Sequence, residues 1–254
     1  MSHIERGLGL SASTTRGRHI VDALLMRIDA GEWRADQRLP VERELAENFG
    51  CTRITLREAL QHLEAQGRIY RENRRGWFVS AARVQHDPTS IASFMQYVAA
   101  QGRQPRTELL SVRRQTAGVD LARPLELTDP NEDVFVLQRR RWIDRRAVLL
   151  ETNVLCASWV PSLLEHDLAG SLSAVLAQLG LYQARSRLTM YPSSLDAEQA
   201  TLLQSTVGAP CFLLQRVSYA TDGRAVEYDI ESWRHDALAV TVEVQAPDTD
   251  RDHA

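Results

Sequence analysis

The sequence contains no lysine, so all thirty of its basic residues are arginines. Arginine stays charged at any physiological pH and can hold a planar anion with two parallel N–H groups. Apart from histidine, every basic side chain in this sequence therefore stays charged. We attribute the bias to the base composition of the genome rather than to a binding function.

Cysteine and histidine are few and scattered. Cys51, Cys156 and Cys211 form no CxxC pair, and the seven histidines include neither an HExxH motif nor a pair at helical spacing. Disulfide frameworks and zinc sites both need closer spacing. The sequence therefore predicts no metal, no cofactor and no catalytic residue of the metal-dependent kind.

Long apolar runs are also missing. No stretch approaches the roughly 20 apolar residues that cross a bilayer, and the first thirteen residues lack the apolar core and basic flank of a secretory signal. We therefore expect a cytoplasmic protein that makes no membrane contact. A chain of 254 residues with 44% hydrophobic content can bury two separate cores, so we expect two domains.

The stretch from Leu39 to Val79 predicts two short helices followed by a hairpin. Apolar residues at helical spacing define the helices, Gly50 ends the first, and Thr52 offers an oxygen to the free amides of the second. After Gly67, two short apolar segments flank a polar turn at 72–75, as in a β-hairpin. With an apolar helix over about 15–30, these elements predict a winged helix-turn-helix.

Arginines at helical spacing mark one face of the second helix. Arg53 and Arg57 project from the same side near the helix start, where backbone amides and the helix dipole favour phosphate. A recognition helix meets DNA in this way, while the hairpin tip forms a basic wing. The predicted DNA-binding residues are Arg43, Thr52, Arg53, Thr55, Arg57, Arg74, Arg75 and Gly76.

The net charge of -3 is distributed unevenly. Residues 1–80 hold 13 arginines against 11 acidic residues, a net charge of +2, whereas residues 81–254 hold 17 against 22, a net charge of -5. The basic excess is therefore small even in the DNA-binding part. Affinity for DNA must depend on where the arginines lie rather than on bulk charge.

The second part of the chain predicts an antiparallel sheet with helices packed on it. Residues 81–90 lack periodicity and contain Pro88, which indicates a linker. Beyond residue 91, strand-like segments alternate with short helices, and compact polar turns at 144–146 and 221–224 indicate antiparallel hairpins. We therefore predict an α+β protein with a DNA-binding domain at 1–80, a linker at 81–90, an effector domain at 91–245 and a flexible tail at 246–254.

Two arginines on a predicted strand are candidates for an anion site. Arg139 and Arg141 alternate along the strand and so point to the same face, where their guanidinium groups could clamp one tetrahedral or carboxylate anion. A charged, solvent-exposed edge strand gives the same spacing, and composition alone makes it the more common case. Ser171 and Ser173 follow Gly170 at the start of a helix, where they could bind an anion or simply cap the helix.

Acidic residues on three predicted strands could complete such a site. Glu227 and Asp229 share a face, and Glu151 lies on an earlier strand. Exposed acidic residues on strands are ordinarily solvated, so the spacing alone does not decide between a solvated face and a binding site.

Two sets of motifs carry a family resemblance. LPVEREL, TRITLREAL and RRGWFV, within residues 39–79, resemble the DNA-binding domain of the GntR family of bacterial transcriptional regulators. Val41 stands where a small capping residue is common, and Arg74 replaces a usual glycine of the wing. Residues 91–240, with SF at 93–94, QGRQP, LQRRRWID, GSL and YATDGRAVEYDIESWRHD, resemble the UTRA effector domain of HutC-type regulators, whose fold is similar to chorismate lyase.

The resemblance implies which residues bind an effector. Arg146 departs from the residue that is usual in the hairpin of the UTRA family. More narrowly, TRITLRE, RRGWFV, DPTS and SWRHD resemble regulators of 2-aminoethylphosphonate degradation. A phosphonate needs strong N–H and O–H donors, and its ammonium needs a carboxylate. The implied effector-binding residues are Ser93, Arg139, Arg141, Glu151, Ser171, Ser173, Glu227 and Trp233.

We therefore expect a homodimeric repressor that binds double-stranded operator DNA and a small anionic or zwitterionic metabolite, and that controls a catabolic operon for phosphonate use. A sugar phosphate or a carboxylate such as urocanate is an alternative effector, and a constitutive DNA-binding protein without an effector is a further one. A lyase-like enzyme that carries a DNA-binding module is less favoured, because the sequence shows no nucleophile–base motif and no phosphate-cradling glycine loop.

Overall fold

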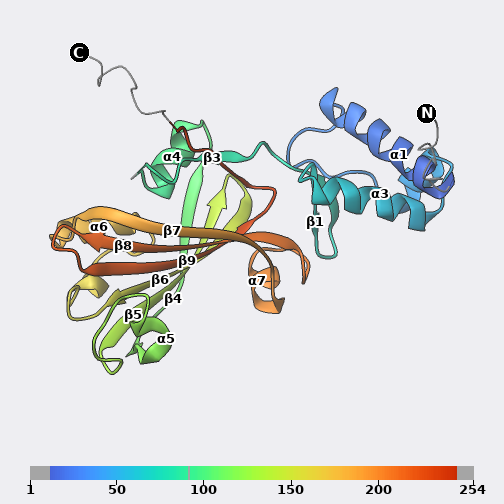
Figure 1. Ribbon diagram of the computed structural model, residues 1–254. Helices are drawn as coiled ribbons and strands as arrows, with labels where there is room; N and C mark the ends of the chain where they lie inside the picture. The colour runs from blue at the N-terminus through green and yellow to red at the C-terminus, as the bar shows by residue number, and fades with distance from the viewer. Residues whose placement is uncertain (1–11, 91, 245–254) are drawn as a thin grey trace, which may run out of the picture. The chain divides into compact units, whose positions relative to one another are not determined.

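The computed structural model describes residues 12–90 and 92–244 (Figure 1). The chain folds into two compact units. One takes in the chain up to Ala82 together with Pro192–Phe212 and Arg234–Ala237, and the other takes in Arg83–Tyr191, Leu213–Trp233 and the chain from Leu238. Two pieces of the predicted effector domain thus group with the first unit. The predicted flexible tail at 246–254 lies outside the described residues.

The N-terminal part of the first unit is the winged helix-turn-helix that the sequence predicts. Its helices are α1 (Ala12–Asp29), α2 (Glu42–Asn48) and α3 (Arg53–Ala65), and its wing is the antiparallel pair β1 (Ile69–Glu72) and β2 (Gly76–Val79). Leu24, Leu45, Leu56 and Leu60 are fully buried in their common core. Burial of these leucines, which recur at helical spacing, holds the three helices together.

The caps of α2 and α3 differ. Thr52 Oγ1 accepts a hydrogen bond from the amide of Thr55 at 3.2 Å, so α3 begins where predicted. Val41 precedes α2 and makes no side-chain hydrogen bond to it. The missing cap follows from the unusual valine, which has no polar atom to offer.

A six-stranded sheet forms most of the second unit, in the order β4-β5-β6-β9-β8-β7 (Figure 1). The strands are β4 (Pro105–Thr116), β5 (Asp133–Ile143), β6 (Arg146–Cys156), β7 (Gln183–Ser194), β8 (Pro210–Ala220) and β9 (Ala225–Arg234). The helices are α4 (Phe94–Ala100), α5 (Gly118–Ala122), η1 (Leu163–Glu165), α6 (Leu172–Gln178) and α7 (Ala197–Leu202). The antiparallel registers of β4, β5, β6 and β9 confirm the predicted α+β class.

The two faces of the sheet are covered by different helices. Val134 and Val136 on β5 pack with α5, whereas Phe135 and Leu137 pack with α6. The next residues on the α6 side of β5 are Arg139 and Arg141, because side chains alternate along a strand. One face of the sheet therefore changes from apolar to charged along its length. A cavity lies at the charged end.

A strand also occurs inside the predicted linker. β3 (Val84–His86) pairs in parallel with β10 (Leu238–Val240), and the sequence analysis predicts neither strand. Both have only three residues, too few for their alternation to be recognised. Among the described residues, no helix is both long enough and apolar enough to span a membrane.

Candidate functional site

The start of α3 presents one arginine, Arg53, to solvent. Arg53 is exposed and makes no hydrogen bond or ion pair with any described residue, whereas Thr55 is half-buried and its hydroxyl lies 3.0 Å from that of Thr52. Ile54 beside them is 73% exposed. An exposed isoleucine at this position is suited to a thymine methyl group, a contact that the sequence analysis did not consider.

Arg57 has a different environment from Arg53. Its Nη2 lies 2.8 Å from Glu42 Oε2, and Trp77 Nε1 donates to the other oxygen of Glu42 at 3.0 Å. Arg57 thereby ties α3 to α2 and β2. Arg53 and Arg57 therefore differ, because Glu42 already pairs with Arg57.

The remaining predicted DNA-binding residues lie on α2 and the wing. Arg43 is exposed and is 3.9 Å from Glu47 on the same helix. At the wing tip, Arg74 and Arg75 are exposed, and Arg75 pairs with Glu72. Arg74 has a φ of 62° and Gly76 one of 101°, so the turn uses left-handed backbone at both residues.

A cavity of about 320 Å³ lies in the second unit, lined from β3, α4, β5, β6, the start of α6, β7, β8 and β9. This volume is at the small end of the range for ligand sites, which suits a small metabolite. Seven of the eight residues implied as effector-binding line it, namely Ser93, Arg139, Arg141, Glu151, Ser171, Ser173 and Glu227. Trp233 is not among its lining residues; its Nε1 instead donates to Glu231 Oε2 at 2.7 Å from within the core.

The arginine pair is buried and already bound to a carboxylate. Arg139 and Arg141 are 1% and 6% exposed, and β5 is an inner strand, so the exposed edge-strand interpretation is wrong. Both guanidinium groups lie 2.7 Å from Glu151 Oε2. Burial alone would raise the pKa of Glu151, but the charges of Arg139 and Arg141 lower it. Glu151 therefore lies between the two guanidinium groups, and its single negative charge offsets one of their two positive charges.

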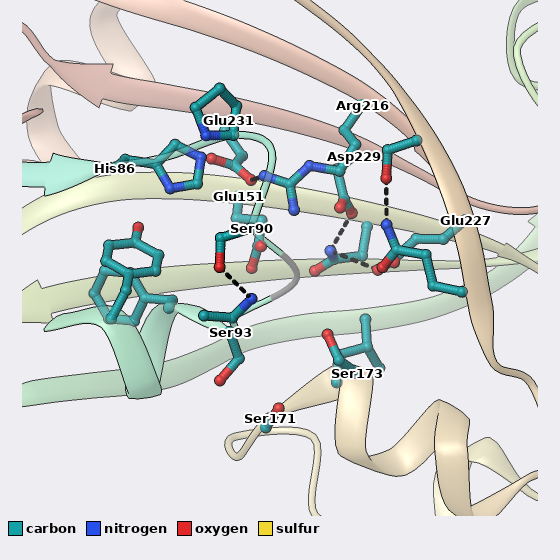
Figure 2. Close-up of a pocket in the computed structure, with 18 of the residues that line it drawn as sticks. His86, Ser90, Ser93, Glu151, Ser171, Ser173, Arg216, Glu227, Asp229 and Glu231 are labelled. Carbon is teal, nitrogen blue, oxygen red and sulfur yellow. Dashed lines mark hydrogen bonds and ion pairs between the residues drawn. The ribbon is translucent and has the colours of Figure 1, made fainter. Parts of the chain in front are cut away.

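A second pair of acidic residues lies on β9 within the same cavity. Glu227 and Asp229 on β9 both accept hydrogen bonds from the amide of Asn153, and among the described residues neither forms an ion pair (Figure 2). Burial, reinforced by the charge of Glu151, raises the pKa of Glu227. Burial and the charge of Glu227 raise the pKa of Asp229 well above its usual value. The protein therefore disfavours a full double negative charge on this pair, although the charge of Arg216 acts in the opposite direction on both groups.

Arg216 and His86 complete this wall, and the sequence analysis predicted neither. Arg216 Nη2 lies 3.2 Å from Glu231 Oε1. His86 is 6% exposed, and its Nε2 has no hydrogen-bond partner. Burial and the charge of Arg216 lower the pKa of His86 to about 4.

The serines line the opposite wall. Figure 2 shows Ser171 and Ser173 at the start of α6, across the cavity from the acidic residues of β9. Ser171 caps α6 by accepting from the amide of Ala174, and Ser93 caps α4 in a reciprocal pair of hydrogen bonds with Gln96. The hydroxyl of Ser173 makes no hydrogen bond to any described residue, so it is available to a ligand.

Two family models match the chain. The model of the bacterial regulatory proteins of the gntR family matches residues 16–79, and the UTRA domain model matches residues 100–239. The HTH-type transcriptional regulator GgaR of Escherichia coli (strain K12) is 30% identical over 209 residues, which are 81% of each chain. The HTH-type transcriptional repressor NagR of Bacillus subtilis (strain 168) is 29% identical over 227 residues, covering 85% of this chain and 89% of NagR.

A solved structure is also similar over most of the chain. The crystal structure of PhnF from Mycobacterium smegmatis aligns with a TM-score of 0.64 and 33% sequence identity, covering 89% of this chain and 99% of PhnF. Both GgaR and NagR are named as transcriptional regulators. This agrees with the expectation that the chain is not an enzyme.

Proposed function

Because the chain belongs to the GntR family of bacterial transcriptional regulators and carries a UTRA domain, we propose that it represses a phosphonate-use operon until 2-aminoethylphosphonate or a close zwitterionic metabolite occupies its cavity. The resemblance of its motifs to regulators of 2-aminoethylphosphonate degradation and its similarity to PhnF support this effector class. A repressor role is supported by the similarity to NagR.

The observation that carries the proposal is that one cavity is lined by both arginine and serine donors and carboxyl acceptors. Asn153 bridges the two sets, because its Oδ1 accepts from Arg139 Nε while its Nδ2 donates to Glu227 and Asp229. Arg139 and Arg141 have five N–H groups each, and the contacts to described residues engage three on each. The remaining N–H groups, with Ser173, bind the phosphonate oxygens, and the acidic pair binds the ammonium.

Binding of 2-aminoethylphosphonate to the full chain is the first test. Calorimetry is expected to show that the parent binds this zwitterion more tightly than ethylphosphonate, which lacks the amine. Ser173→Ala is expected to weaken both ligands about tenfold, because each loses a hydrogen bond from a neutral hydroxyl to a charged oxygen. A parent that ignores both phosphonates but binds a sugar phosphate would show that the effector assignment is wrong.

On the DNA side, α3 enters the major groove and the wing contacts the backbone. Arg53 is the base-reading residue, because its guanidinium has no partner among the described residues. Thr52, Thr55 and Gly76 lie beside the arginines and position the backbone, while Arg43, Arg74 and Arg75 contact phosphates. Arg57 supports α3 through Glu42 and contributes less.

The regulator acts as a homodimer in this proposal. β7 is an end strand of the sheet, and ten of its twelve residues are exposed, with only Leu188 and Met190 partly buried. Long exposed edge strands are usually covered, and pairing with a second copy provides a cover. Sedimentation equilibrium of the full chain is expected to give twice the mass of one chain; a single-chain mass at micromolar concentration would contradict the dimer.

A further inference from the structure

A short stretch before α2 extends the wing. Residues 36–39 run antiparallel to β2, and Arg38 lies opposite Phe78. Gln37 and Leu39, on either side of Arg38, are hydrogen-bonded to the backbone of β2 with N···O distances of 3.0 and 2.8 Å. The wing therefore has a short outer strand besides β1 and β2, and backbone hydrogen bonds on both sides fix the position of Arg38.

The side chain of Arg38 lies against the glycine at the wing tip. A Cβ atom added to Gly76 would lie only 3.3 Å from Arg38 Nε, so glycine leaves the space that the guanidinium group occupies. Gly76 directly follows Arg74 and Arg75 in the chain. Arg38 therefore brings a third guanidinium group to this turn from a distant part of the sequence.

Arg38 carries a positive charge that no described residue offsets. Its side chain is exposed, and it makes no hydrogen bond, ion pair or ring contact with any described residue. Glu72 of the wing pairs with Arg75, and Glu42 of α2 pairs with Arg57. Like charges gathered at one turn repel one another, and an anion bound there removes that cost.

We propose that Arg38 binds a DNA phosphate at the wing tip. The inference rests on the proposed contact between the wing and DNA, and it adds a residue to that contact. Phosphate is favoured over a base edge because the guanidinium group lies along the backbone of the wing rather than projecting from the recognition helix. The fork of a guanidinium group also matches two phosphate oxygens.

Replacement of Arg38 in the full chain tests the proposal, with binding to a fluorescent duplex as the measurement. One duplex is selected by the parent from a random library, and an unrelated duplex has the same length. Arg38→Gln keeps a polar side chain but removes the charge. At about 0.15 M salt we expect it to weaken both complexes about fivefold, and to reduce the slope of log K against log salt by about 0.9. Arg38→Lys, which keeps the charge, is expected to keep the slope of the parent.

Arg34→Gln is the matched control on the same segment. Arg34 is also exposed, but it precedes the stretch that pairs with β2, and so lies beyond the end of that strand away from Gly76. We expect it to leave the slope unchanged. An equal drop in slope in Arg34→Gln and Arg38→Gln would show that net charge causes the loss, and would overturn a contact at the tip.

Arg74→Gln separates this inference from the proposed wing contact. If Arg74→Gln lowers the slope and Arg38→Gln does not, the Arg38 contact is overturned while the wing contact stands. If neither variant lowers the slope, the wing does not touch DNA and both proposals fail. A loss in Arg38→Gln that is confined to the selected duplex would mean that Arg38 reads a base, which overturns the phosphate contact.

Discussion

Replacing Glu151 with alanine is expected to lower the free energy of unfolding by about 3 to 5 kcal/mol, because it leaves two buried guanidinium groups without their shared carboxylate. Arg139 and Arg141 both lie 2.7 Å from Glu151 Oε2 and are almost fully buried. Arginine cannot relieve the penalty by losing its proton. Chemical unfolding of the full chain, followed by circular dichroism, measures the change.

Glu108→Ala is a matched control on β4, which lies on the other side of β5 from the strand of Glu151. Glu108 also binds an arginine of β5, with Arg140 Nη2 2.8 Å from its Oε2, but its side chain is 37% exposed. Solvent screens such a pair, so its loss should cost less than about 1 kcal/mol. Comparable losses in the two variants would mean that water reaches Arg139 and Arg141 when Glu151 is removed, and that their burial does not govern stability.

Arg53→Ala is expected to reduce operator discrimination by about 1 to 3 kcal/mol at one base pair in each half-site, as loss of a bidentate contact to guanine would. The physical reason is that Arg53 is the arginine at the start of α3 whose donors are unused within the described fold, whereas those of Arg57 bind Glu42. Binding sites selected from a random library by the parent, then varied one base pair at a time, provide the measurement.

Arg43→Ala removes the same charge from the exposed surface of α2. It is expected to weaken all sequences about equally, because a phosphate contact carries no sequence information. If Arg53→Ala behaves like Arg43→Ala, with a uniform loss and unchanged base preference, the assignment of Arg53 to base reading is incorrect.

Local pattern was sufficient to predict most of the fold. The leucines of α3 recur at helical spacing, and the turns at 144–146 and 221–224 are short and polar, so the helices and hairpins followed from neighbouring residues. β3 and β10 depend on each other across more than 150 residues, and three residues are too few to show a period. Their pairing comes from tertiary packing, which local sequence does not encode.

Part of the lining of the cavity was predictable from the sequence, but the charge pairing within it was not. Alternation on β5 correctly placed Arg139 and Arg141 on one face, yet it gave no sign that Glu151 on the next strand would pair with both. Register decides that pairing, because Arg139 lies directly opposite Glu151. His86 and Arg216 were missed since each is an isolated polar residue in an otherwise unremarked segment. For Arg216, the one available signal was its alternation with Leu214 and Ser218 along β8.

At the wing tip, fold stability and DNA binding favour different residues. Arg74 adopts a φ of 62°, a left-handed conformation that costs a residue other than glycine about 1 to 2 kcal/mol. Glycine would relieve this strain but would remove the positive charge nearest the turn. The free protein is thus less stable than it would be with glycine at this position. The lost stability lies in the turn that we propose contacts the operator. Glycine at this position would therefore raise thermal stability and lower DNA affinity, whereas arginine has the opposite effect on both.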